Sequence, residues 1–158
     1  MKRTLRVVVL ALAGVLATPA VAAADVTFFL GFSPTPETRS MRGVAAGINL
    51  LLVGFEFDYA HTSEDPAAGA PGLRTGMMNA VLMTPTKTQL YLTAGAGFFR
   101  ETLAGSSETS VGTNLGGGIK FSLIGPLQVR LDYRVFNLRG DARFRHPQRV
   151  YAGLNLAF

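Results

Sequence analysis

Residues 127–135 read LQVRLDYRV, and in this stretch every second residue is apolar while those between are polar or charged. Residues 53–60 read VGFEFDYA and repeat the pattern, with Val, Phe, Phe and Tyr on one face and Gly, Glu, Asp and Ala on the other. A period of two residues places alternate side chains on opposite faces of a β-strand, and it does not fit a helix with a single apolar stripe. Both stretches therefore predict strands with one apolar and one polar face.

The same alternation continues through most of the chain after Asp25. It predicts eight strands, at about residues 25–33, 43–51, 53–61, 73–83, 89–100, 109–123, 127–138 and 148–158. The connections expected at 33–42, 62–72, 101–108 and 139–147 are long and polar, whereas those near Leu52, at 84–88 and at 124–126 are short. Long loops at one end and short turns at the other are typical of an antiparallel up-and-down barrel that spans a membrane. An even number of strands places both termini at the short-turn end.

The apolar phase of these predicted strands contains no charged residue. It includes Phe28, Phe55, Leu92, Leu131 and Leu154. An Arg or Lys that faces lipid near the middle of a bilayer costs about 2 to 4 kcal/mol, so the exclusion has an energetic reason. A soluble barrel would show the opposite arrangement, with its charges outside and its apolar side chains inside. The pattern favours a transmembrane β-barrel.

The polar phase collects a balanced set of charges. It holds three acids and three bases, and we expect these six residues to form a lumen charge network: Glu56, Asp58, Lys120, Arg130, Asp132 and Arg134. An unpaired charge in a dry interior is costly, so equal numbers of the two signs favour ion pairs across a filled lumen. The sequence therefore predicts a plugged barrel rather than an open bore.

The beginning of the chain has the three parts of a secretory signal peptide. Lys2, Arg3 and Arg6 form a charged start, residues 7–17 are an apolar run, and residues 20–24, AVAAA, offer small residues for cleavage. A membrane-spanning helix needs about 20 apolar residues, and this run is about half as long. We expect a cleavable signal peptide at residues 1–24 and a single barrel domain at residues 25–158.

Composition narrows the range of functions. Hydrophobic residues make up 48% of the 158 residues and charged residues only 16%, which is apolar for a soluble domain. The absence of Cys excludes disulfides, thiolate metal sites and a cysteine nucleophile. Removal of Lys2, Arg3 and Arg6 lowers Lys plus Arg from 15 to 12 against 10 acids, and the formal net charge falls from +5 to +2. Such a small charge gives no support for nucleic-acid binding.

One stretch suggests an enzyme, because His61, Ser63 and Glu64 are the residue types of a nucleophilic triad. Neighbouring residues at a strand end point to opposite faces, however, and a triad requires side chains that converge. The second histidine, His146, lies far away in the sequence with no evident acidic partner, and no metal-ligand spacing is found. We expect no enzyme activity, no cofactor and no bound metal.

A basic rim is predicted at the long-loop end. The last predicted loop contributes Arg139, Arg143, Arg145 and Arg149, and the ends of other strands contribute Arg39, Arg42, Arg74 and Arg100. Guanidinium groups bind phosphate through two hydrogen bonds, so the four arginines of the last loop are candidates for contact with lipopolysaccharide phosphates. The alternative is a solvated rim in which Glu101, Glu108 and Asp141 are their partners.

Three segments, in order, resemble the OmpA/OmpX-like eight-stranded outer-membrane barrels. Residues 54–59, GFEFDY, are similar to that family's alternating segment ending in Asp-Tyr, and residues 116–121, GGGIKF, with 131–134, LDYR, are similar to its glycine-rich strand and following Asp-Tyr. Residues 150–158, VYAGLNLAF, resemble the C-terminal signal read by the barrel assembly machinery. The assembly-signal residues that this resemblance implies are Tyr151, Leu154, Leu156 and Phe158.

The resemblance covers residues 25–158 and implies insertion by that machinery into the outer membrane of a Gram-negative-type bacterium, with periplasmic termini. It implies no reaction, since members act as envelope structural proteins, adhesion or immune-evasion factors and narrow pores. The leading expectation is a monomeric, non-enzymatic outer-membrane protein with a structural or surface-interaction role and with lipid and lipopolysaccharide as partners. The open alternatives are a narrow pore gated by Glu56 and Arg130, a lipid A-modifying enzyme that depends on Ser63, and a soluble periplasmic barrel.

Overall fold

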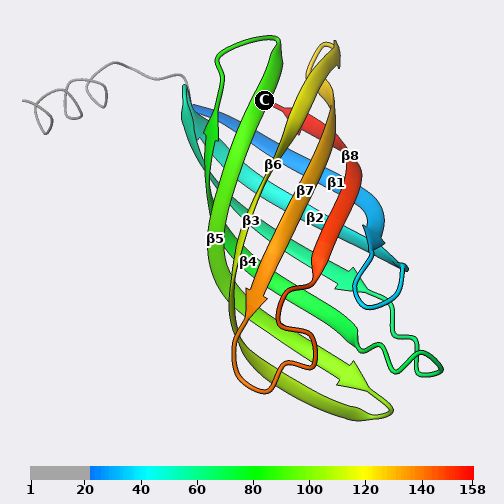
Figure 1. The fold of residues 1–158 in the computed structure, drawn as a ribbon. Helices are drawn as coiled ribbons and strands as arrows, with labels where there is room; N and C mark the ends of the chain where they lie inside the picture. The colour runs from blue at the N-terminus through cyan, green and yellow to red at the C-terminus, as the bar shows by residue number, and fades with distance from the viewer. Residues whose placement is uncertain (1–21) are drawn as a thin grey trace, which may run out of the picture.

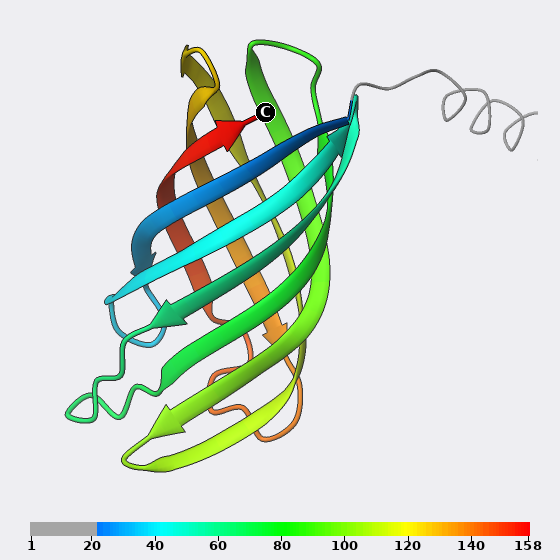
Figure 2. The same cartoon turned by 180° about the vertical axis from the view of Figure 1, so that it is seen from behind.

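The computed structural model describes residues 22–158 and forms a closed barrel of eight antiparallel strands (Figures 1 and 2). The strands are β1 (Ala22–Ser33), β2 (Arg39–Leu50), β3 (Val53–Thr62), β4 (Gly72–Met83), β5 (Thr88–Leu103), β6 (Ser106–Ile124), β7 (Leu127–Leu138) and β8 (Gln148–Ala157). Each strand pairs with the next one in sequence, and β1 pairs with β8 to close the sheet. The predicted fold is confirmed. The expected signal peptide lies outside the described residues, apart from residues 22–24, which begin β1.

The two ends of the barrel differ in their connections. At the turn end, residues 51–52, 84–87 and 125–126 join the strands, and at the loop end residues 34–38, 63–71, 104–105 and 139–147 do so. Phe158 and the start of β1 both lie at the turn end (Figure 1). There the backbone N–H of Ala24 donates to the carbonyl of Phe158 at 2.8 Å, and the N–H of Phe158 donates back at 2.8 Å.

The prediction of a long polar loop at residues 101–108 is wrong. β5 and β6 continue through this region and meet in a two-residue turn, in which Ala104 and Gly105 have positive φ values of 49° and 83°. Two positive φ angles suit the turn that joins twisted strands most tightly. The resulting hairpin projects beyond the other strands at the loop end (Figure 1). Its strands are polar on both faces, so the alternation that marked the other strands is missing here.

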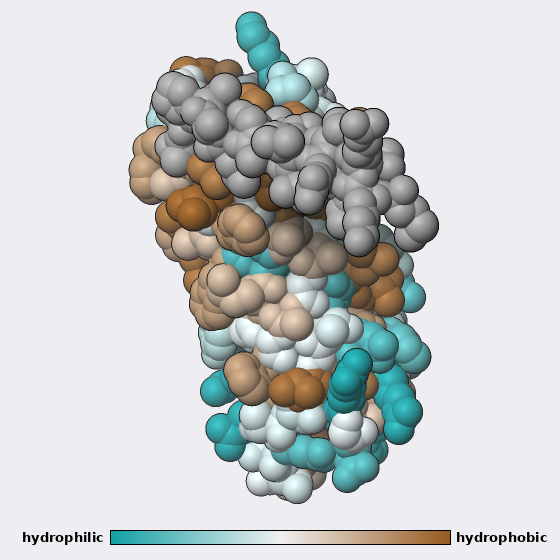
Figure 3. All heavy atoms as spheres, turned by 90° about the vertical axis from the view of Figure 1, so that its left-hand side faces the viewer, coloured by the Kyte–Doolittle hydropathy of each residue, from teal (hydrophilic) through white to brown (hydrophobic). Residues whose placement is uncertain are grey.

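The outer face of the barrel is apolar over most of its height. Phe28, Leu92, Phe98 and Leu115 are 60%, 65%, 67% and 66% exposed, respectively. Hydrophilic side chains gather toward the loop end of the face in Figure 3, and hydrophobic side chains lie closer to the turn end. No helix of residues 22–158 is long and apolar enough to cross a membrane.

The interior also contains three apolar clusters, which the sequence did not predict. An apolar cluster at the loop end consists of Leu73, Met77, Phe99, Phe136, Leu138 and Ala142, and a smaller one toward the turn end consists of Val81, Met83 and Tyr91. A third cluster, on the β1–β2 side, contains Phe29, Met41, Ala45, Ala60 and Tyr151. Inward-facing apolar residues thus pack around the charged residues, and the polar phase of the strands does not form a uniformly polar lumen.

Candidate functional site

Two arginines of β7 form the centre of the interior charge network. Arg134 contacts three carboxylates, with its Nη1 2.7 Å from Asp58 Oδ2, its Nη2 2.9 Å from Glu56 Oε1 and its Nε 2.9 Å from Asp132 Oδ1. Arg130 forms ion pairs with Glu56 and, at 3.1 Å, with Asp132. Both guanidinium groups are fully buried. Glu56 and Asp132 therefore each have two cationic partners.

The strand pattern explains why these residues meet. Alternation turns Arg130, Asp132 and Arg134 inward from β7 and turns Glu56 and Asp58 inward from β3. In the closed order of eight strands, β3 and β7 are four steps apart in either direction, so they form opposite walls. The ion pairs between them therefore cross the lumen.

Arg149 belongs to this network, and its expected place in the loop-end rim is wrong. β8 begins at Gln148, so the side chain of Arg149 points into the barrel and is only 3% exposed. Its Nη1 lies 3.1 Å from Asp58 Oδ1, and its Nη2 donates to the hydroxyl of Thr75 at 2.5 Å. The sequence held the signal, because Arg149 shares the inward phase of Tyr151 and Asn155.

Lys120 is buried inside the barrel, but it does not join the other five residues. Its Nζ lies 2.6 Å from Asp25 Oδ2, and Asn49 donates to the same oxygen at 2.9 Å. The network therefore contains Glu56, Asp58 and Asp132 with Arg130, Arg134 and Arg149, while Lys120 and Asp25 form a separate pair. Asp25 was missed, although its inward phase follows from the outward phase of Val26 and Phe28.

Tyrosine and asparagine side chains complete the network. Tyr91 accepts a hydrogen bond from Arg130 Nε at 2.7 Å and donates one to Asp132. Asn79 donates to Asp58 at 2.6 Å. The side chain of Tyr151, expected in the assembly signal, is buried in the lumen, where its ring stacks on Phe29 with 4.2 Å between centroids and its hydroxyl accepts from Arg134 at 3.3 Å. These contacts satisfy polar atoms that burial would otherwise leave without partners.

Glycines of β6 make room for these long side chains. A Cβ added to Gly116 would lie 2.6 Å from Arg134 Cγ, and one added to Gly118 would lie 2.5 Å from the Tyr91 hydroxyl and 2.0 Å from the Leu131 carbonyl. An interior formed by eight strands is just wide enough for side chains to fill. Both glycines thus let the neighbouring strands and the network side chains approach closely.

The last loop covers the interior at the loop end. Its backbone N–H groups at Arg139, Asp141 and Arg143 donate to the Val111 carbonyl at 3.0 Å, to Glu108 Oε1 at 3.3 Å and to Glu101 Oε2 at 3.0 Å. Burial, with a smaller contribution from nearby Glu108, raises the pKa of the Glu101 carboxyl. The loop is therefore fastened to the inner side of the β5–β6 hairpin.

The structure shows which arginines of the expected basic rim are exposed and which are buried. Glu101 and Glu108 accept backbone N–H groups, and in the described part of the chain neither forms an ion pair within 4 Å with an arginine of the loop. Arg139, Arg143 and Arg145 are exposed. Arg39 is buried instead, because it donates to the carbonyls of Thr35 at 2.8 Å, Ser63 at 3.1 Å and Pro71 and so joins two loops.

The three residues of the possible triad are not joined to one another by hydrogen bonds in the described part of the chain. Ser63 bonds to the carbonyl and hydroxyl of Ser40, and Glu64 accepts the backbone N–H of Ala104 at 2.7 Å. His61 faces the outer wall, and no hydrogen bond joins it to Ser63 or Glu64 within residues 22–158. That range also contains no group of three or more His, Cys, Asp or Glu residues that could hold a metal ion. The geometry offers no assembled nucleophile.

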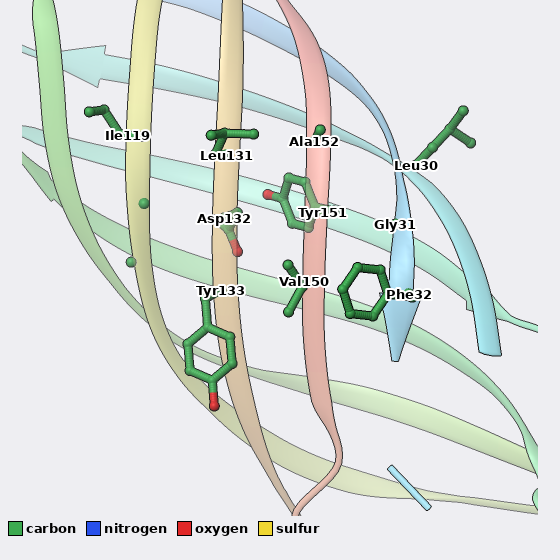
Figure 4. Close-up of a pocket in the computed structure, with 12 residues that line it drawn as sticks. Leu30, Gly31, Phe32, Ile119, Leu131, Asp132, Tyr133, Val150, Tyr151 and Ala152 are labelled. Carbon is green, nitrogen blue, oxygen red and sulfur yellow. The ribbon is translucent and has the colours of Figure 1, made fainter. Parts of the chain in front are cut away.

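Shallow grooves indent the outer wall. Figure 4 shows one with a volume of about 710 Å³, lined by residues of β1, β6, β7 and β8 that include Leu30, Leu131 and Val150. A neighbouring groove of about 840 Å³ lies over β1, β2, β7 and β8 and is lined by Phe28, Val129 and Leu154 among others. Both are almost entirely apolar, so the seam between β1 and β8 presents apolar surface to its surroundings.

Comparison with solved structures identifies the fold. The chain is similar to the N-terminal β-barrel domain of OprF from Pseudomonas aeruginosa, with 14% identity over 86% of this chain and 97% of that chain and a TM-score of 0.67. It is also similar to Neisserial surface protein A, with 18% identity over 87% and 96% and a TM-score of 0.64. A major outer membrane protein from Thermus thermophilus matches with 12% identity over 87% and 100% and a TM-score of 0.64. No protein-family model and no curated protein matches the sequence.

Proposed function

We propose that this chain, whose eight-stranded fold is that of outer-membrane barrel proteins, is a monomeric integral outer-membrane protein with a closed lumen and a structural or surface-interaction role. The apolar outer face supports this placement. A soluble monomer seldom exposes such a large continuous apolar surface, whereas a membrane barrel requires an apolar band about 25 Å tall. The proposal includes no enzyme activity, because His61 faces the outer wall while Ser63 and Glu64 form hydrogen bonds with other residues.

The proposal that the lumen is closed rests on one observation, which is that the guanidinium groups of Arg130 and Arg134 are fully buried. Three arginines form ion pairs with three carboxylates inside the barrel, and none of the six residues is more than 4% exposed. An ion path along the lumen would have to break these pairs and leave charges without partners, which is costly in a low-dielectric interior. The side chains are therefore better suited to closing the barrel than to conducting ions.

The proposed route to the membrane uses both ends of the chain. Residues 1–24 act as a cleaved signal peptide, and Tyr151, Leu154, Leu156 and Phe158 are read by the barrel assembly machinery. The side chains of Leu154, Leu156 and Phe158 are 54%, 41% and 73% exposed on the outer face, as a recognised segment requires. Tyr151 would be read before the barrel closes, since it is buried afterwards. With this orientation the turn end, and both termini, face the periplasm.

The loop end then faces outward and offers a basic surface. Arg139, Arg143 and Arg145 are exposed there. Guanidinium groups bind phosphate through charge-assisted hydrogen bonds, so these arginines are suited to contacts with lipopolysaccharide phosphates or with an anionic partner outside the cell.

Membrane fractionation and single-channel recording test the proposal. We expect the protein in the outer-membrane fraction, extracted only by detergent, with a folded band that migrates differently from the heated one. We expect no steady conductance when the folded protein is added to a planar bilayer in which an open porin conducts under the same conditions. Extraction without detergent would refute the membrane placement, and steady conductance that Arg130→Met changes would favour the gated pore.

A lipid A assay tests the absence of enzyme activity. Purified folded protein is incubated with lipid A, and the lipid is analysed by mass spectrometry. We expect an unchanged lipid mass for wild type and for Ser63→Ala. Loss of an acyl chain with wild type but not with Ser63→Ala would overturn the non-enzymatic assignment.

A further inference from the structure

A row of basic side chains crosses the outer wall near the loop end. The strand register pairs Arg42 with His61, His61 with Arg74, and Arg74 with Arg100. Since paired residues of neighbouring strands project from the same face, all four side chains lie on the outer surface, over β2, β3, β4 and β5. The sequence predicted Arg42, Arg74 and Arg100 in the loop-end rim, but only the strand register aligns them with His61 in one row on the outer wall.

Arg74 and Arg100 are the two arginines of this row that are direct neighbours. They stand directly opposite each other on adjacent strands, an arrangement that places Cβ atoms about 5 Å apart and is unfavourable for like charges. Neither forms an ion pair with any acid of residues 22–158, and the seven ion pairs of that range all lie inside the barrel. Arg100 donates only to the hydroxyl of Ser107, at 2.9 Å. Two adjacent guanidinium groups without an acid form a site that an anion would stabilise.

A groove begins directly below these arginines, toward the turn end. It has a volume of about 390 Å³, and its lining includes Tyr59, Arg74, Gly76, Phe98 and Arg100. The register places Gly76 between Tyr59 and Phe98, so the missing side chain of Gly76 leaves a notch between two aromatic rings. The groove is thus basic at one end and apolar along its floor.

Gly76 differs from the other strand glycines of the described chain. A Cβ added to it would meet nothing closer than 3.8 Å, where it would touch the ring of Phe57, whereas every other strand glycine would bring its Cβ within 3.3 Å of a neighbour. Its φ is not in the positive region that favours glycine. Neither packing nor backbone conformation therefore requires glycine at this position, and the empty volume is available to a ligand.

We propose that Arg74 and Arg100 bind the phosphate group of a membrane lipid and that the Gly76 groove binds the adjoining part of its acyl chain. Phosphate accepts two hydrogen bonds from each guanidinium group and neutralises their mutual repulsion, and the apolar floor suits a hydrocarbon chain. A free phosphate ion would use the arginines and leave the groove empty. The inference rests on the proposed function, since it requires this wall to face lipid.

A second groove extends the same site. It has a volume of about 420 Å³, lies on the other side of Phe98, and is lined by Ala96, Val111, Thr113 and Arg139 among others. Phe98, 67% exposed, forms the ridge between the two grooves. Two apolar grooves, each with arginine toward the loop end, suit a phosphorylated lipid with more than one acyl chain.

Native mass spectrometry of the folded protein in a zwitterionic detergent tests the site. The probes are lipid A with its phosphates, the same lipid after dephosphorylation, and inorganic phosphate. We expect one lipid A adduct that dephosphorylation weakens at least tenfold, and about tenfold weaker binding for each of Arg74→Gln and Arg100→Gln. The matched control, Arg42→Gln, removes an exposed charge from the same row at a position that lines neither groove of the site, and it should leave the affinity within about twofold.

Two results would overturn the phosphate contact: equal binding of the dephosphorylated lipid, or equal losses in the control and in Arg74→Gln/Arg100→Gln. Displacement of lipid A by inorganic phosphate at similar concentrations would show an anion site without lipid and would also overturn the proposal.

Gly76→Leu tests the groove. We expect it to weaken lipid A binding about tenfold, because a leucine side chain fills the space of several methylene groups, while Gly76→Ala has a smaller effect. Both variants are checked for the heat-dependent shift in migration, so that loss of fold is recognised. Unchanged binding by folded Gly76→Leu would refute the acyl-chain groove. Because the assay uses purified protein, a failure to bind lipid is distinguishable from a failure of the protein to reach the outer membrane.

Discussion

Arg134 inside the barrel and Arg74 on its outer wall are the same residue type in opposite surroundings. Arg134 is fully buried and contacts three carboxylates, whereas Arg74 is exposed, faces Arg100 and has no acid within 4 Å among the described residues. Burial makes an unpaired charge prohibitively costly, so the interior arginines have partners within the chain. The wall arginines lie where water or headgroups can solvate them, and they are left available to an external anion. Four comparisons test this contrast, from the largest expected effect to the smallest.

Arg134→Met should give the largest loss of stability. It leaves the carboxylates of Glu56, Asp58 and Asp132 short of one positive charge in the interior, and removal of one partner from a buried ion pair costs about 3 to 5 kcal/mol. The measurement is urea unfolding of the barrel in lipid vesicles. Arg143→Met, on the exposed loop, is the control and should change the free energy of unfolding by less than about 0.5 kcal/mol. Equal effects of the two variants would mean that the network does not stabilise the barrel.

Lys120→Met should have a smaller effect, because it leaves one carboxylate, Asp25, without its cation. We expect a loss of about 2 to 3 kcal/mol, part of which the hydrogen bond from Asn49 offsets. The double variant Lys120→Met/Asp25→Asn should recover stability to within about 1 kcal/mol of wild type, since no buried charge is then left unpaired. Unfolding of all three variants in urea provides the comparison. Additive losses in the double variant would contradict the pairing.

Replacing one interior glycine and one wall glycine with alanine compares how tightly the two regions are packed. Gly118→Ala places a methyl group 2.0 Å from the Leu131 carbonyl and should cost about 1 to 3 kcal/mol through overpacking. Gly76→Ala meets nothing closer than 3.8 Å and should stabilise the strand by about 0.5 to 1 kcal/mol, because alanine loses less backbone entropy. Thermal unfolding in detergent measures both. A destabilised Gly76→Ala would show that this wall is more tightly packed than the structure indicates.

Arg74→Gln should have the smallest effect on the free energy of unfolding. It should stabilise the barrel, whereas Arg134→Met should destabilise it. It removes a repulsion between directly opposite like charges and should stabilise the barrel by about 0.2 to 1 kcal/mol in the absence of anionic lipid. Salt screens exposed charges, so the gain should shrink as ionic strength rises. Unfolding in zwitterionic detergent at low and high salt measures the difference. A loss of stability at low salt would mean that Arg74 has a favourable partner within the chain.

The largest sequence-based errors arose at the edges of strands. Arg149 was grouped with the arginines of the last loop although the predicted strand 148–158 already contained it, and the inward phase that continues to Tyr151 and Asn155 placed it in the interior. The extension of β5 to Leu103 and of β6 back to Ser106 was missed because strands that leave the apolar band need no apolar face, so their alternation disappears. Arg39 was assigned to the rim because nothing local shows that the carbonyls of two other loops would surround it.

The sequence by itself determined which side of the wall most residues occupy. Alternation is a local property, since each Cβ projects opposite to the one before it, and so Glu56, Asp58, Arg130, Asp132 and Arg134 could be assigned to the interior. Only the tertiary structure decided which charges meet, because closure of the sheet brings β3 opposite β7 and sets the register of each pair of strands. The partnership of Lys120 with Asp25 and the adjacency of Arg74 and Arg100 both depend on that register, which no single strand encodes.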